Sequence, residues 1–185
     1  MILLISGVGL LTIAITLGVL FIYNPFIMES VQNQPLQECN VIYDNGGETN
    51  IVFVSDRETA KRYMDFLFTV PPFSEHKESF NAYYIESGIV DEECEIHKGV
   101  ALLCYSKKII KEVSACPNDY IVVLKEMSKS VRSSSFLNVM SINSAHTLSV
   151  FAHEFGHAYA NFAEEYLTNA KIPLGSENCQ KKCEG

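Results

Sequence analysis

Two histidines four residues apart, with a glutamate directly after the first, constrain this chain more than any other feature. The segment His153-Glu154-Phe155-Gly156-His157 lies where large apolar residues recur at helical spacing, namely Leu148, Phe151, Phe155, Tyr159 and Phe162. This periodicity predicts an amphipathic helix with a buried apolar stripe, and Asn143 or Ser144 is its expected N-cap. The two histidines lie off that stripe, on one face and one turn apart.

The spacing of these histidines is typical of a zinc-binding helix. Two neutral imidazoles one turn apart can take two corners of a tetrahedral zinc site. Zinc lowers the pKa of a water molecule toward about 7, and a nearby glutamate can take its proton during attack on a carbonyl. The segment matches the H-E-x-x-H motif of metalloproteases. We therefore predict Zn²⁺ as cofactor, His153 and His157 as ligands and Glu154 as catalytic base. The alternative is a partly buried helix whose histidines are satisfied by other contacts.

A catalytic zinc site needs a third protein ligand, and two glutamates are candidates. Glu164 and Glu165 lie seven and eight residues after His157. On an unbroken helix either would lie more than about 10 Å along the axis from His157. The helix must therefore end near Ala160-Asn161, and Asn161 is a plausible C-terminal cap because asparagine tolerates the left-handed conformation. The alternative for the two glutamates is a solvated pair at a helix end.

The first 28 residues are expected to lie outside the domain that carries this helix. No charged residue occurs from Ile2 to Tyr23, and 22 helical residues span about 33 Å, enough for a bilayer core of about 30 Å. We predict a transmembrane anchor or uncleaved signal over residues 1–28. A cleaved signal peptide and a buried core helix are the alternatives. Residues 29–49, with Pro35 and the turn-like Asp44-Asn45-Gly46-Gly47, are predicted as a linker.

The cysteines indicate the compartment. All six follow the apolar segment, and an even count in that position favours an oxidising environment. We expect Cys94 to pair with Cys104, and Cys179 or Cys183 to pair with a distant partner. The alternative for Cys179 and Cys183 is a structural zinc site. The protein is thus predicted to be membrane-anchored with an extracytoplasmic domain, or secreted.

The net charge of −8 argues against nucleic acid as a partner, because phosphate binding needs a basic surface. The charges are scattered along the chain, so a solvated acidic surface explains them. The expected partners are a peptide or protein substrate and, through the N-terminal helix, the membrane.

Apolar runs and helical patterns alternate after Asn50 and predict an α/β layer structure. Strands are expected at 51–54, 80–85, 120–124 and, more weakly, 135–142. Helices are expected at 58–68 and 107–113, and the acidic segment 89–97 is expected to be a loop.

The run Val150 to Tyr166, VFAHEFGHAYANFAEEY, resembles the immunoglobulin A peptidase family of metallopeptidases. Pro72-Phe73 leading to Phe80-Asn81, and Asp119 to Leu124, are less specific points of similarity. The resemblance implies a zincin-like α/β domain over residues 50–185 and zinc-dependent peptide hydrolysis. It also implies Glu165 as the preferred third ligand, because the family keeps Glu at that position, with Glu164 close behind.

The chain departs from the family pattern after the helix. Related zincins place a Met-containing turn beneath the metal, whereas no Met follows Met140 and the sequence ends 28 residues after His157 (157 to 185). This predicts a C-terminally truncated domain. Two further functions therefore stay open: a catalytically inactive zinc-binding relative that acts as an extracellular binding module, and a zinc hydrolase for a non-peptide substrate.

Overall fold

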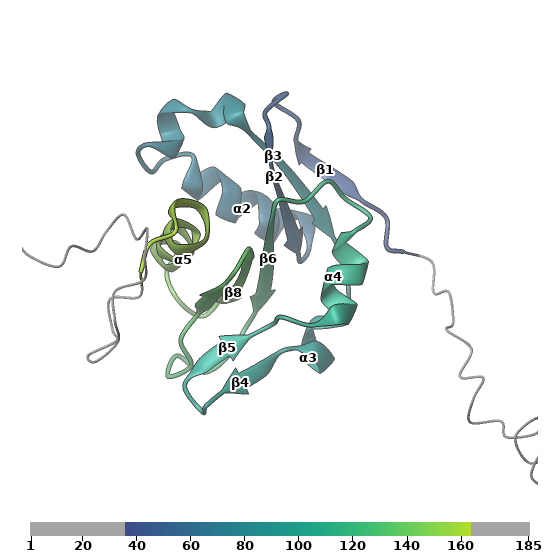
Figure 1. Ribbon diagram of the computed structural model, residues 1–185, viewed down its shortest axis with the longest axis vertical. Helices are drawn as coiled ribbons and strands as arrows, with labels where there is room; N and C mark the ends of the chain where they lie inside the picture. The colour runs from purple at the N-terminus through teal and green to yellow at the C-terminus, as the bar shows by residue number, and fades with distance from the viewer. Residues whose placement is uncertain (1–35, 164–185) are drawn as a thin grey trace, which may run out of the picture. The chain divides into compact units, whose positions relative to one another are not determined.

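The computed structural model describes residues 36–163, in which a six-stranded mixed sheet forms the centre (Figure 1). Its strands, in spatial order, are β1 (Asn40–Tyr43), β3 (Phe80–Ile85), β2 (Thr49–Val54), β6 (Tyr120–Lys125), β8 (Val139–Asn143) and β7 (Ser134–Phe136). The four inner strands run parallel, and the two edge strands are antiparallel to their neighbours.

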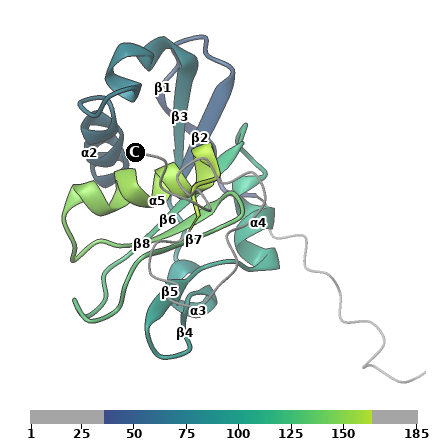
Figure 2. The ribbon, with the colours of Figure 1, turned by 60° about the vertical axis from the view of Figure 1, so that its left-hand side comes forward.

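The inner strands are continuous apolar runs because both of their faces are covered. Ile51, Phe53 and Val122 face a core shared with helices α2 (Arg57–Leu67) and α5 (Leu148–Ala160). Val52 and Val123 face a second core on the other side of the sheet. Figure 2 shows α5 crossing the sheet on the same side as α2.

The second core is closed by α4 (Lys107–Val113) and by the segment around α3 (Val90–Glu93) and the two-stranded sheet of β4 (Glu95–His97) and β5 (Ala101–Leu103). Two short 3₁₀ turns, Phe73–Glu75 and Lys77–Ser79, precede β3. The expected strands at 51–54, 80–85 and 120–124 and the helices at 58–68 and 107–113 are thus confirmed, with boundaries within one residue or two.

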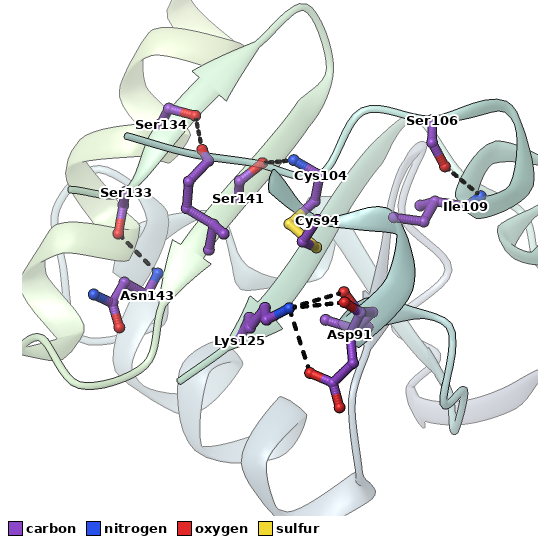
Figure 3. Close-up of a disulfide and its surroundings, with 12 residues drawn as sticks. Asp91, Cys94, Cys104, Ser106, Ile109, Lys125, Ser133, Ser134, Ser141 and Asn143 are labelled. Atoms are coloured by element: carbon purple, nitrogen blue, oxygen red, sulfur yellow. Dashed lines mark hydrogen bonds and ion pairs between the residues drawn. A yellow bond between two sulfur atoms is a disulfide. The ribbon is translucent and has the colours of Figure 1, made fainter. Parts of the chain in front are cut away.

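Two disulfides tie the second core together. The predicted pair Cys94–Cys104 is present, and Cys39 bonds Cys116 across a separation of 77 residues. Cys104 and Cys116 are buried, so both bonds are part of the packed interior (Figure 3 shows Cys94–Cys104). Disulfides of this kind are typical of proteins in oxidising compartments. Cys179 and Cys183 lie outside the described residues.

Three local predictions differ from the structure. The segment 135–142 is a hairpin rather than one strand, because Leu137 adopts φ 55° and reverses the chain between β7 and β8. The acidic segment 89–97 contains α3 and β4 rather than a loop. The expected linker, residues 29–49, contains β1 in its described part.

The general prediction of an α/β fold is confirmed, but the finer prediction of a zincin-like zinc domain preceded by a transmembrane helix is wrong for the described residues. No helix among residues 36–163 is long and apolar enough to cross a membrane. The same residues contain no group of three or more His, Cys, Asp or Glu that could hold a metal ion. The physical reason is that α5 brings only two imidazoles together, whereas a metal site needs at least three ligating side chains. The expected anchor, residues 1–28, lies outside the described range.

Candidate functional site

Helix α5 is held against the sheet by an aromatic cluster. Phe151 and Phe155 are fully buried, and the ring of Phe155 lies within 5.2–6.2 Å of its neighbours Phe73, Phe80, Tyr120, Tyr159 and Phe151. Burial, together with nearby Tyr159 and Asp119, raises the pKa of Tyr120. The predicted apolar stripe is therefore the packing face of α5, and the opposite face is turned away from the sheet.

The opposite face brings the two predicted histidines together. The Nε2 atoms of His153 and His157 are 3.1 Å apart, and their rings are nearly perpendicular at a centroid distance of 4.7 Å. Two nitrogens bound tetrahedrally to one zinc at about 2.0–2.1 Å would be separated by about 3.3 Å. The observed separation of the two nitrogens is close to that value, so the imidazoles fit two positions of a zinc site.

The chain after α5 orients His157. Asn161 ends the helix in the left-handed conformation, with φ 53° and ψ 39°, as the sequence predicts. This reversal places the carbonyl oxygen of Phe162 2.9 Å from Nδ1 of His157. A hydrogen bond donated by Nδ1–H leaves the lone pair on Nε2, which is the nitrogen that points at His153.

Gly156 allows this reversal to pack closely. A Cβ at position 156 would lie 3.2 and 3.3 Å from two carbons of the Phe162 ring. Contacts this short require the ring to shift, so the absence of a side chain at Gly156 lets Phe162 fold back over the helix. The close approach of the Phe162 ring therefore explains why a glycine is present within α5.

Glu154 lies between two hollows. Glu154 is only 8 % exposed. It lines a hollow of about 590 Å³ beside His153 and a second hollow of about 260 Å³ beside His157. A carboxylate that is largely buried yet borders both hollows can exchange a proton with a bound molecule while bulk water has little access. This is the position expected for a general base.

The two residues predicted as alternatives for the third metal ligand, Glu164 and Glu165, lie outside the described residues. The structure thus brings together three of the predicted site residues, His153, Glu154 and His157. A zinc ion here would need a further ligand from outside residues 36–163.

The N-terminal end of α5 is set by Asn143, although not as the expected cap. The N-cap is Thr147, and Asn143 is the buried last residue of β8. Its side chain makes four hydrogen bonds of 2.7–3.1 Å to backbone groups, namely those of Met127, Ala145, Ser128 and Val131. Its own N–H donates to Ser133 Oγ at 3.0 Å (Figure 3). Asn143 therefore fixes both the loop before β7 and the entry to α5.

We expect Asn143→Ala to lower the free energy of unfolding by about 2–3 kcal/mol, because it leaves buried backbone groups without partners. Urea denaturation followed by circular dichroism measures the change. Asn40→Ala is the matched control, since the Asn40 amide makes one exposed hydrogen bond, to the Glu38 carbonyl. Equal losses in the two variants would contradict the role assigned to Asn143.

Residues that the sequence did not single out complete the larger hollow. They include Arg132, Ser134, His146 and Ser149, which come from the loop before β7, β7 itself, the loop between β8 and α5, and the first turn of α5. None of them lies in a local motif, so only the folded chain shows that they border His153 and Glu154.

Comparison of the chain with protein-family models finds no match. No curated protein matches it significantly either.

Proposed function

We propose that this protein is a zinc-dependent peptidase in which His153 and His157 bind the metal and Glu154 is the general base. The observation that carries the proposal is the convergence of the two Nε2 atoms, 3.1 Å apart, directly beside a buried glutamate that borders two hollows. The resemblance of residues 150–166 to the immunoglobulin A peptidase family supports the same function. Glu165 or Glu164 is proposed as the third ligand.

Each residue has one task in this proposal. Zinc, when bound, supplies a Lewis acid that polarises a carbonyl and lowers the pKa of a water molecule. Glu154 accepts a proton from the attacking water and delivers it to the nitrogen of the leaving amine. The Phe162 carbonyl keeps His157 in the tautomer that can bind a metal.

The neighbouring strand favours a peptide as substrate. β7 is an edge strand of the six-stranded sheet. β5 contacts its start, where Ser134 Oγ donates to the Leu102 carbonyl, and an extended peptide could pair with the rest of this edge through backbone hydrogen bonds. Ser134 lines the larger hollow and Ser135 lines the smaller one. A peptide lying along β7 would therefore pass both hollows and Glu154. We propose that the protein acts outside the cytosol, membrane-anchored or secreted, in keeping with its disulfides.

Zinc content tests the proposal directly. We expect the full-length oxidised protein to bind one zinc per chain, and His153→Ala to lose most of it, because one of three protein ligands is removed. Metal analysis after dialysis measures the stoichiometry, and cleavage of an unfolded protein with and without a chelator measures activity. His97→Ala is the control, since His97 is exposed in β4. Absence of both zinc and chelator-sensitive cleavage in the wild-type protein would refute the proposal.

A further inference from the structure

Two exposed apolar residues border the smaller hollow, the one beside His157. Leu137 lies at the turn between β7 and β8, and Phe162 follows the end of α5. Both line this hollow of about 260 Å³, which Glu154 also lines. Leu137 is 67 % exposed and Phe162 is 40 % exposed. Two segments far apart in the sequence thus bring apolar surface next to the proposed general base.

The ring of Phe162 has a defined place on α5. Two of its carbons lie 3.2 and 3.3 Å from the point that a Cβ at Gly156 would occupy, so the ring lies against the helix one residue before His157. The carbonyl oxygen of Phe162 is 2.9 Å from Nδ1 of the same histidine. Phe162 is therefore held beside a proposed metal ligand, and part of its surface stays exposed.

Leu137 adopts a backbone conformation that does not suit leucine. Its φ is 55°, in a region that bulky side chains rarely adopt, and two-residue hairpin turns of this kind prefer glycine or asparagine there. Its high exposure shows that it does not belong to the core either. Residues held in such conformations cluster at ligand-binding sites. Neither the turn nor the core explains a leucine at this position, whereas contact with a bound molecule does.

The size and charge of the smaller hollow fit one uncharged side chain. Its volume of about 260 Å³ is below the roughly 300–1,000 Å³ of pockets that enclose a whole small molecule. Among the described residues, those that line it include no lysine and no arginine, and the acidic one is Glu154. An acidic side chain would be repelled by Glu154, and a basic one would pair with the carboxylate that has to accept a proton. An apolar side chain avoids both effects.

We propose that Leu137 and Phe162 form an apolar subsite that binds one large apolar side chain of the peptide substrate, next to the bond that is cleaved. Binding there removes apolar surface of the peptide and of both residues from water. Leu137 directly follows β7, so a peptide lying along that strand would pass this subsite. The inference rests on the proposed peptidase function and adds the substrate class: peptides with a residue such as Leu or Phe beside the cleaved bond.

Matched peptides test this preference. Fluorogenic peptides of one sequence carry Leu, Asn, Asp or Lys in turn at each position near the cleaved bond, and kcat/KM is measured for each. We expect Leu to exceed the similarly shaped Asn by about tenfold or more at one position, the scale on which hydrophobic pockets discriminate. Leu137→Gly should lower this ratio by about threefold or more, and its combination with Phe162→Ala should bring the two peptides to within about twofold, because less apolar surface is buried.

The turn itself tolerates Leu137→Gly, because glycine adopts positive φ without strain. We expect the Tm of this variant to stay close to that of the wild type, so that a lost preference is not a loss of folding. Leu36→Gly is the matched control, since Leu36 is 49 % exposed and lines neither hollow. A Leu preference that persists in the double variant, or that falls equally in Leu36→Gly, would overturn the subsite. A wild-type preference for Asp or Lys would do so as well.

Binding separates this inference from the peptidase function. The dissociation constants of the Leu and Asn peptides, labelled with a fluorophore, are measured by anisotropy on the Glu154→Gln variant, with and without added zinc. We expect the Leu peptide to bind more tightly, and the two subsite substitutions added to that variant to remove the difference. Tighter binding of the Leu peptide without any cleavage by the wild type would refute the peptidase function and support the apolar subsite. Cleavage without a Leu preference would do the reverse, and equal binding of the two peptides would count against the subsite.

Discussion

Glu154→Gln is expected to lower kcat/KM for peptide cleavage by about 10²–10⁴-fold, the range that a positioned general base contributes. Glutamine fills the same buried space but cannot accept a proton at neutral pH. Because Glu154 is only 8 % exposed and borders both hollows, no other described side chain occupies an equivalent place beside His153 and His157. Zinc content and secondary structure should stay at wild-type levels, since the glutamine is isosteric and the two imidazoles are unchanged.

The measurement is cleavage of a fluorogenic peptide together with metal analysis on the same sample. Glu86→Gln is the control, because Glu86 is an exposed residue directly after β3 that lines neither hollow. Wild-type cleavage by a fully zinc-loaded Glu154→Gln variant would show that Glu154 is not the base. If the wild-type protein holds zinc yet cleaves nothing, and Glu154→Gln leaves binding of a partner unchanged, the chain acts as a zinc-containing binding module instead.

The parts of the fold that the sequence predicts are those with a local signal. Ile51–Val54 and Tyr120–Leu124 read as strands because both faces of a parallel inner strand are covered, which requires an unbroken apolar run. The helix over residues 148–160 follows from its 3.6-residue periodicity, and its end follows from the tolerance of asparagine for positive φ. His153 and His157 meet because a helix places residues four apart on one face.

The parts that were missed depend on tertiary contacts. The β7–β8 hairpin reverses at Leu137, and leucine gives no turn signal because positive φ is rare for it. Asparagine is a common N-cap residue, but Asn143 is buried at the end of β8. There its side-chain amide donates to the backbone carbonyls of Ser128 and Val131 instead. Cys39 pairs with Cys116 over 77 residues, a choice among fifteen pairings that spacing does not decide. Arg132 lines the larger hollow together with Ser133 and Ser134, because the fold places this segment near His153 and Glu154.

Phe155→Ala is expected to produce the largest loss of stability, about 3–5 kcal/mol, the usual cost of emptying a fully buried phenylalanine site. Phe155 is 0 % exposed and its ring contacts aromatic rings from the turn at Phe73, from β3 and from β6. Phe155 also lies between His153 and His157 in the sequence. The cavity left by Phe155→Ala would therefore let α5 shift toward the sheet and move the two imidazoles. The expected fall in Tm is about 10–20 °C, accompanied by weaker zinc retention.

Thermal unfolding measures the shift in Tm, and Phe136→Ala is the matched control because Phe136 is 50 % exposed and makes an edge-to-face contact with Tyr105 at the surface. That substitution should cost under about 1 kcal/mol, since little apolar surface is removed from the interior. Phe155→Leu should fall between the two, because leucine refills most of the cavity. If Phe155→Ala were no more destabilising than Phe136→Ala, α5 would not be packed on the sheet as described. The separation of the two Nε2 atoms would then lose its structural support, because the aromatic cluster is what holds the histidine-bearing helix in place.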